Sequence, residues 1–437
     1  MDEQVNSPAM AKDGSAPKRK RGAPRKATRG QVLDIATRLI NRRGVVATLL
    51  ADVAREIGVT RMAMYQHVAD REDLVFQCYV QSCDRLDDEV AQAASTAGGA
   101  IEQIRVMLRR LLGPEAPALC AIVEPGLLPE DKRREVERRF DAVIARIVAL
   151  LDAGHRDGIV RACDFEIVAR ALINTLFWAP LAMLWNRRRL EITGPSMLQS
   201  AECLFFDGWA SDRSAAVEYR PLDIETLTSP VADAFDRAAV GDAKRERILA
   251  AASRLFNSKG IDSTTLEDIA AAIGATPRTL YHNVGDKETL VAECYFRMMR
   301  MGIHLQSAAF DQPGPKLPGY IAFQKAWALT QMRADLSPLM PLAGFEMLSA
   351  QHQARFYGYA DELTVLTLAH VQQGVVDGSM RPIGTFATAL QAGVLGWLAR
   401  ASYTDAAQQE HVAREIAILL AVGIRAIERE PANAMRF

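Results

Sequence analysis

One segment of this sequence occurs twice, and this repeat constrains the fold more than any other feature. Residues 29–79 and 245–295 align without a gap at a constant offset of 216, and 22 of the 51 positions are identical. Such self-similarity is typical of a duplicated structural unit. The 437 residues are enough for two to four domains, so the chain can hold both units and further domains.

Helical periodicity runs through both copies. Between Val32 and Ile40 the apolar residues recur at the spacing of one helix face, and the same pattern starts again at Ile248. Strand-type alternation is hard to find anywhere in the chain. We therefore predict an all-α protein built from two tandem units.

Glycines and threonines divide each copy at equivalent places. The first helix is expected to end at Gly44 or Gly260, because glycine readily adopts the left-handed conformation that stops a helix. A second helix is expected to begin near Thr48 or Thr264, whose hydroxyl can accept a free backbone N–H.

A tight turn then joins the second helix to a third. The second helix should end at Gly58 or Gly274, only about two turns on. Thr60 or Thr276 can cap the third helix, and Pro277 fits its first position in the second copy. Two short helices joined in this way form a helix-turn-helix.

This motif presents the N-terminal residues of its last helix to the major groove of DNA. Arginine can pair with guanine, threonine and alanine can touch a thymine methyl, and tyrosine and histidine can reach phosphate. Met64 and Leu280 are expected to face the core instead. The predicted DNA contacts are Thr60, Arg61, Met62, Ala63, Tyr65, His67 and Arg71 in the first copy, and Thr276, Arg278, Thr279, Tyr281, His282, Asn283 and Lys287 in the second.

The helix after each motif also has a predicted cap. Asp70 and Asp286 can cap it, which would place Arg71 or Lys287 against the DNA backbone. A disordered basic arm is expected before the first copy, with no acidic residue between Lys18 and Arg29, and such arms can reach an adjacent minor groove. Its candidate contacts are Lys18, Arg19, Lys20, Arg21, Arg25 and Lys26.

Together these residues resemble the N-terminal DNA-binding domain of TetR-type (tetracycline repressor-like) transcriptional regulators. The second copy, RERILAAASRLFNSKGIDSTTLEDIAAAIGATPRTLYHNVGDKETL, matches the family pattern of Ile-Leu-x-Ala-Ala, Thr-Thr, Ile-Ala, Gly, Thr-Leu-Tyr and Lys-Glu-x-Leu. The first copy departs at Leu49, Met62 and Ala63, and both copies carry Val, as Val68 and Val284, where Phe is usual. The resemblance implies that a helical domain for ligand binding and dimerisation follows each copy.

The chain leaves room for two such regulatory domains. We predict a basic arm over 1–28, DNA-binding domains over 29–80 and 243–295, regulatory domains over 81–211 and 296–437, and a linker over 212–242. A second, shorter repeat indicates that the regulatory part is duplicated as well. Gly154, Asp157, Gly158 and Arg161 recur at an offset of 220 as Gly374, Asp377, Gly378 and Arg381.

Each regulatory domain ends in two apolar helices, expected over Phe165–Trp185 with Pro195–Ala210, and over Phe386–Tyr403 with Gln409–Glu428. The resemblance implies that these four helices form the dimer interface. We predict that the two halves of one chain pair there as an intrachain pseudo-dimer, while further homodimerisation stays open.

Aromatic and methionine side chains crowd both regulatory domains. They could line a cavity for a small apolar effector, although most are expected in the core. They are Phe177, Trp178, Met183, Trp185, Phe205, Phe206 and Trp209 in the first domain, and Tyr320, Phe323, Trp327, Met340, Phe345, Met347 and Trp397 in the second.

Other classes of site and location have little support. Six cysteines show no CxxC pairs and the histidines are scattered, so we expect no disulfide framework, metal or cofactor. The N-terminus lacks a secretory pattern, and the longest apolar run, from Ile167 to Trp185, carries Arg170, Asn174 and a proline. We expect a reducing, cytoplasmic location and no membrane span.

These features favour a DNA-binding transcriptional regulator, a ligand-responsive repressor whose two recognition helices enter successive major grooves of an imperfectly palindromic operator. In one alternative, one helix-turn-helix is a non-binding scaffold and two chains dimerise. In another, the protein is a helical enzyme or a ligand-sequestering protein. No nucleophile, base or cofactor motif supports an enzyme.

Overall fold

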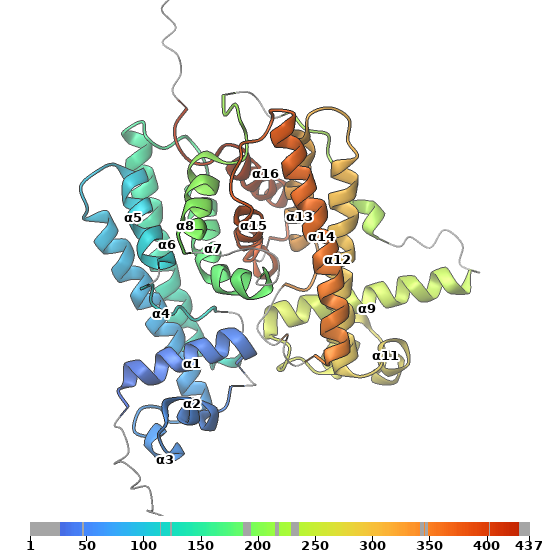
Figure 1. Ribbon diagram of the computed structural model, residues 1–437. Coiled ribbons are helices and arrows are strands. Elements are labelled where there is room, and N and C mark those ends of the chain that lie inside the picture. Colours follow the sequence, from blue (N-terminus) through green and yellow to red (C-terminus); the bar gives the residue numbers. More distant parts are fainter. Residues whose placement is uncertain are drawn as a thin grey trace, which may run out of the picture.

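The computed structural model describes residues 27–45, 48–113, 115–122, 125–186, 194–214, 218–228, 236–340, 345, 348–401 and 403–427. In this part of the chain every regular element is a helix, and extended pairing is confined to two isolated bridges. The all-α prediction is confirmed. In the view of Figure 1 a helix-turn-helix unit lies at the lower left and another at the lower right, with the longer regulatory helices above them.

The two halves have the same order of helices. The first half consists of α1 (Arg29–Arg43), α2 (Leu50–Ile57), α3 (Arg61–Met64), α4 (Arg71–Ala94), α5 (Ala100–Leu112), η1 (Pro125–Leu127), α6 (Glu130–Arg156), α7 (Phe165–Asn186), α8 (Gly194–Glu202) and the π-helical turn η2 (Cys203–Asp207). The second half consists of α9 (Arg237–Lys259), α10 (Leu266–Ile273), α11 (Pro277–Val284), α12 (Lys287–Phe310), α13 (Lys316–Met332), α14 (Ala350–Val376), α15 (Phe386–Leu395), η5 (Leu398–Arg400) and α16 (Ala406–Val422). The short helix η3 (Ile224–Leu227) lies between the halves.

Helix α9 begins earlier than the sequence indicates. Its N-cap is Asp236, whose carboxylate accepts the backbone N–H groups of Ala238 and Ala239. The linker predicted over 212–242 is therefore too long at its C-terminal end. The hydrophobic pattern did not indicate the first turn and a half of α9. Its residues, Gly241 among them, are exposed or half-buried and form no apolar face.

Glycines end the helices of both units where the sequence places them. Gly44 and Gly260 follow the first helix of each unit with φ of 88° and 95°. Gly58 and Gly274 follow the second helix in the left-handed conformation, with φ of 81° and 67°. Positive φ is strained for residues with a Cβ, so these four positions fix the turn geometry.

The predicted caps of the second helix are wrong by one residue. The hydroxyls of Thr48 and Thr264 donate to carbonyls four residues earlier, at 2.7 and 2.8 Å. In the second unit Thr265 is the N-cap and forms a capping box with Asp268. In the first unit the cap is Leu49, which offers no side-chain acceptor.

The two halves pack along their C-terminal helices. Helix α7 lies against α15, and the indole N–H of Trp178 donates to the Ala389 carbonyl at 2.7 Å. The end of η2 meets the end of α16 at two glycines, Gly208 and Gly423, with φ of 66° and 65°. A Cβ on either glycine would lie 2.3–2.4 Å from backbone atoms of the other half, so only glycine allows this crossing.

The recurring Gly-x-x-Asp-Gly-x-x-Arg motif forms the other part of this contact. Val160 in the first half forms a bridge with Arg425, and Met380 in the second half forms one with Ala210. The Arg161 guanidinium adds a bond from Nε to the Gly423 carbonyl at 2.6 Å. The repeated motif therefore forms, in each half, the turn that contacts the other half.

The C-terminal helices differ from prediction in the second half. Helix α15 stops at Leu395 and gives way to η5, whereas the sequence predicted a helix continuing to Tyr403. Gly396 ends it through an i→i+3 bond to the Gly393 carbonyl. Helix α16 stops at Val422, because Gly423 then takes a positive φ. Among the described residues, no helix is both long and apolar enough to cross a bilayer.

Equivalent cysteines lie in the core of both units. Cys78 and Cys294 are fully buried free thiols that donate to the carbonyls of Leu33 and Leu249 at 3.7 and 3.6 Å. Burial raises the pKa of both thiols to about 12. They act as small core residues, because the reactive thiolate form is disfavoured.

Candidate nucleic-acid interface

The last helix of each motif, α3 or α11, is held in place by a threonine cap and one buried side chain. Thr60 accepts the backbone N–H of Ala63, and Thr276 accepts that of Thr279. Met64 and Leu280 are fully buried, which confirms that they face the core. The opposite face of α3 and of α11 is therefore presented to solvent.

An arginine at the start of each unit secures the far end of this helix. In the second unit Arg245 donates to the Asn283 carbonyl at 2.7 Å. In the first unit Arg29 reaches Gln77 at 2.8 Å, and the Gln77 amide donates to the His67 carbonyl at 3.2 Å. The same arginine thus performs the same task directly in one copy and through a glutamine in the other.

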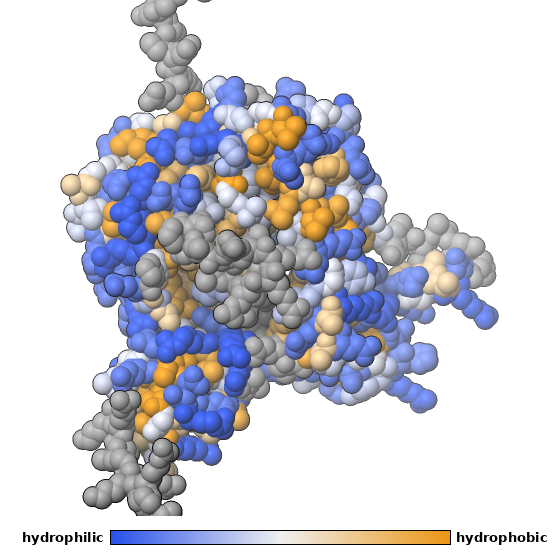
Figure 2. Space-filling view, viewed as in Figure 1, coloured by the Kyte–Doolittle hydropathy of each residue, from blue (hydrophilic) through white to orange (hydrophobic). Residues whose placement is uncertain are grey.

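The structure brings the predicted contacts of each motif together on one exposed face. Exposed positions are Thr60, Arg61, Met62, Tyr65, Thr276, Arg278, Thr279, Tyr281 and His282, whereas Ala63, His67 and Asn283 are half-buried. Large apolar exposure is greater in the first unit, where Met62 is 75% and Leu49 53% exposed. In Figure 2 the first unit, at the lower left, shows more hydrophobic colour than the second unit.

The two recognition helices differ in length. Helix α11 ends at Val284 and is capped by Gly285, whose φ of 72° allows its N–H to bond back to the Tyr281 carbonyl. The equivalent residue in the first unit is Ala69, and α3 ends at Met64, beyond which the chain continues as turns up to Val68, whose N–H donates to the Met64 carbonyl at 3.1 Å. Because a Cβ disfavours positive φ, Ala69 cannot end a full helix in the way that Gly285 does.

The exposed polar groups are also engaged differently. Arg61 donates to the Tyr65 hydroxyl at 3.2 Å, so these two side chains hold each other. Within the described part of the second unit, Arg278, Tyr281 and His282 make no side-chain polar contact. Their side chains are available to a ligand that approaches this face.

The helix that follows each motif, α4 or α12, is capped as predicted. The carboxylates of Asp70 and Asp286 accept backbone N–H groups at 2.8 Å, and the bond from Thr289 lowers the pKa of Asp286. Arg71 is exposed, but the Lys287 ammonium donates to the Asp262 carbonyl at 3.1 Å. Lys287 therefore braces a turn of its own unit here. The predicted basic arm, Lys18 to Lys26, lies outside the described residues.

An asparagine at the end of the first helix ties each unit to its regulatory domain. The Asn41 amide donates to the Leu119 carbonyl at 2.7 Å and accepts the Ala121 N–H at 2.9 Å. Asn257 makes the same pair of bonds with the Pro338 carbonyl, at 3.0 Å, and the Met340 N–H, at 2.9 Å. Sequence reasoning missed these residues, although their identity at the offset of 216 was a usable signal.

The family model "Bacterial regulatory proteins, tetR family" matches residues 32–78 and 248–294, which are the two helix-turn-helix units. The chain therefore carries the TetR-type helix-turn-helix domain twice, as the internal repeat predicted.

Named relatives agree with this assignment over part of their length. The chain is 34% identical over 86 residues to the HTH-type transcriptional regulator AcrR of Shigella flexneri, a match that covers 20% of this chain and 40% of AcrR. It is 39% identical over 69 residues to TtgR of Pseudomonas putida, covering 16% of this chain and 32% of TtgR. The chain thus matches less than half the length of these relatives.

Among solved structures, the TetR family regulator PfmR from Thermus thermophilus is 26% identical. It aligns over 43% of this chain and 98% of its own, with a TM-score of 0.35. A TetR-family protein from Rhodococcus is 23% identical, covering 41% and 97% of the two chains, with a TM-score of 0.33.

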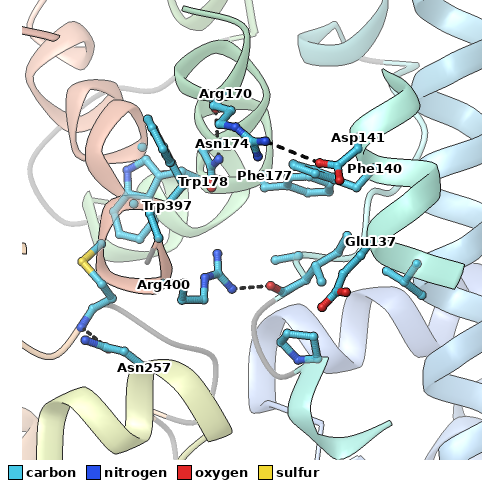
Figure 3. A pocket seen from close by; sticks show the side chains of 18 of the residues that line it. Glu137, Phe140, Asp141, Arg170, Asn174, Phe177, Trp178, Asn257, Trp397 and Arg400 are labelled. Carbon is cyan, nitrogen blue, oxygen red and sulfur yellow. Dashed lines mark hydrogen bonds and ion pairs between the residues drawn. The ribbon is translucent and has the colours of Figure 1, made fainter. Parts of the chain in front are cut away.

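A cavity of about 570 Å³ lies between the two halves of the chain (Figure 3). Of the aromatic and methionine residues predicted for an effector cavity, Phe177, Trp178, Met340 and Trp397 line it. Phe205, Phe206, Trp209, Tyr320, Phe323 and Phe345 are buried in the core, and Trp327 packs against it. Met347 and the side chains of Met183 and Trp185 lie outside the described residues.

Proposed function

We propose that this protein is a sequence-specific double-stranded DNA-binding transcriptional regulator. The observation that carries the proposal is the exposed face of α11, with Arg278, Tyr281 and His282 available beside a threonine cap. Arginine at such a position can pair with guanine, and tyrosine and histidine can reach phosphate. The second exposed face, on α3, belongs to the same polypeptide.

We further propose that both units of one chain contact one operator. The contact between α7 and α15 would replace the interface between two subunits, so one chain would act as a pseudo-dimer. Recognition helices that enter successive major grooves must lie about 34–36 Å apart. Because Met62 and Ala63 stand where the second unit has Arg278 and Thr279, the two half-sites should differ in sequence.

Regulation would follow from a small molecule that changes the separation or tilt of the two units. Such a ligand would shift the population between a DNA-competent and an incompetent arrangement. Release of DNA on ligand binding would make the protein a repressor of the ligand-responsive type. The ties at Asn41 and Asn257 give regulatory motions a direct route to both units.

Selection of bound sequences from random duplex DNA with the full chain tests this proposal. We expect two unequal half-sites, one chain per operator, and an affinity that falls steeply with salt because phosphate contacts release counterions. A perfect palindrome bound by one chain would count against the paired arrangement. An affinity that does not depend on salt would favour the alternative of an enzyme or a ligand-sequestering protein.

A second candidate is that the first unit is a scaffold and two chains dimerise to bind DNA. The short α3 and the exposed Met62 favour it. Replacing Tyr65 and Tyr281 separately by alanine distinguishes the cases. Loss of binding from either change supports two working units, whereas loss from Tyr281→Ala alone, with two chains per operator, supports the scaffold.

A further inference from the structure

We propose that the cavity between the two halves is an effector site that takes one small aromatic anion per chain. This inference rests on the proposed regulatory function and adds to it the place, the number and the chemical class of the ligand. The cavity volume of about 570 Å³ lies within the usual range of small-molecule sites.

Both halves build the cavity walls. Phe140 from α6 and Phe177 from α7 come from the first half, whereas Trp397 and Arg400 come from the second. Figure 3 shows these side chains around one space, with Arg400 below Trp397 and opposite Glu137. A ligand in this space would therefore touch both halves at once.

The aromatic walls suit a flat apolar body. The indole N–H of Trp178 is used by the Ala389 carbonyl at 2.7 Å, and that of Trp397 by the Val394 carbonyl at 3.1 Å. With their N–H groups satisfied by the protein, both rings can offer apolar surface to a ligand. Aromatic pairs in this arrangement favour a ligand that carries a ring of its own.

The charges in the cavity favour an anion. Arg400 is half-buried, and its guanidinium donates to the Ile122 carbonyl. In the described part of the chain it has no carboxylate partner, whereas Arg170 is paired with Glu166 at 2.9 Å. Burial lowers the pKa of Arg400, so its charged form is desolvated and a ligand carboxylate would stabilise it.

Each acidic residue that lines the cavity has an arginine partner. Asp141 lies 3.5 Å from Arg170, and Glu137 lies 3.8 Å from Arg133. The Asp141, Glu137 and Glu166 side chains are 57–63% exposed, so solvent screens their charge. Arg400 is therefore the cation that a ligand anion would meet inside the cavity.

A larger side chain stands in the second half at the position equivalent to one wall of this cavity. Helices α6 and α14 correspond at the offset of 220. Phe356 of α14 is therefore the equivalent of Val136 of α6, which lines the cavity. Phe356 is fully buried and packs at 4.7 Å from Phe345 and 5.5 Å from Tyr295, between ring centroids. A larger side chain thus fills in one half the volume that valine leaves open in the other, so one site per chain is expected.

The cavity also touches the ties to both DNA-binding units. Ala121, held by Asn41, and Met340, held by Asn257, each line it. A ligand that draws Arg400 from the Ile122 carbonyl would loosen the segment next to Ala121. Binding at one place can therefore move α1 and α9 relative to each other.

The test uses the full chain with 1-naphthaleneacetate and its uncharged amide, titrated by calorimetry without DNA. We expect one saturable site per chain and at least about tenfold tighter binding of the acid. Arg400→Met should abolish this preference, whereas Arg138→Met, on an exposed position of α6, should keep it. Val136→Phe, which copies the second half, should weaken binding of both probes.

Thermal unfolding confirms that each variant is folded, and operator affinity is measured separately with and without probe. Equal affinity for acid and amide, no saturable binding, two sites per chain, or an unchanged preference in Arg400→Met would overturn the site. Probe binding with unchanged operator affinity would overturn its effector role. Failure to bind DNA without probe would instead refute the proposed function and leave the titration result standing.

Discussion

The two halves of this protein are most alike where they pack against each other and least alike at the recognition helices and in the interiors of the regulatory domains. Gly208 and Gly423 cross with nearly the same backbone angles, and the turns at Gly158 and Gly378 serve both sides of one contact. The recognition helices and the regulatory interiors have diverged. The pairing geometry admits little change, because Gly208 and Gly423 each meet backbone atoms of the other half, whereas exposed faces and cavities tolerate substitution.

The difference between the helix-turn-helix units has a local cause. Thr265 and Gly285 give the second unit a capped α10 and a full α11, and the first unit has Leu49 and Ala69 at these positions. Two substitutions at helix ends therefore account for a weaker cap and a shortened helix. On these grounds the second unit has the more regular helix-turn-helix.

The strongest test of the shared contact compares two glycine variants. Gly423→Ala should lower the free energy of unfolding by about 3 kcal/mol or more, because it adds backbone overlap to positive-φ strain. Gly378→Ala, which has the same strain and open space around its Cβ, should lower it by only about 1–2 kcal/mol. Chemical denaturation measures both, and equal losses would show that the crossing is not tight.

The next test compares equivalent faces of the recognition helices. Arg278→Ala should weaken operator binding by about 1–3 kcal/mol and relax specificity at one base pair. Arg61→Ala should have a smaller effect, because Arg61 already donates to Tyr65. Competition binding at fixed salt gives both values, and a larger loss for Arg61 would reverse our ranking of the units.

A smaller effect is expected from exchanging the caps. Thr265→Ala should destabilise the protein by about 1 kcal/mol, since it removes the capping box of α10. Leu49→Thr should stabilise it by about 0.5–1 kcal/mol, because Asp52 already stands three residues on and can complete the box. Urea unfolding checks both variants. If Leu49→Thr has no effect, the missing cap does not explain the difference.

The smallest expected effect is a pH dependence confined to the second half. His370 is buried, its Nδ1 lies 2.7 Å from the Gln306 amide, and desolvation lowers its pKa. The unfolded chain binds this proton below about pH 6.5, so stability should be complete above that pH and fall as the pH decreases. His370→Leu, which copies Leu150 of the first half, should reduce this slope in urea unfolding between about pH 7 and about pH 5.

The sequence predicted the helix-turn-helix units well but sorted the regulatory domains poorly. Their glycine stops, threonine caps and buried Met64 and Leu280 depend on contacts within a few residues, which periodicity reveals. The error at Thr264 was also local, since the adjacent Thr265 can cap the helix equally well and only backbone geometry chooses between them. In the first copy the cap position falls on Leu49, which has no side-chain acceptor, so Thr48 was the nearest residue that could have capped the helix. The start of α9 was missed because exposed helical residues show no apolar face.

The sequence by itself determined that the protein is helical, duplicated and equipped with two recognition helices, because these properties arise from spacing along the chain. Only the tertiary structure decided which aromatic residues line a cavity and that Arg400 meets Ile122 across 278 residues. It also decided that Asn41 and Asn257 tie both units to the walls of one cavity. Contacts between distant residues leave no periodic trace, so packing alone assigns them.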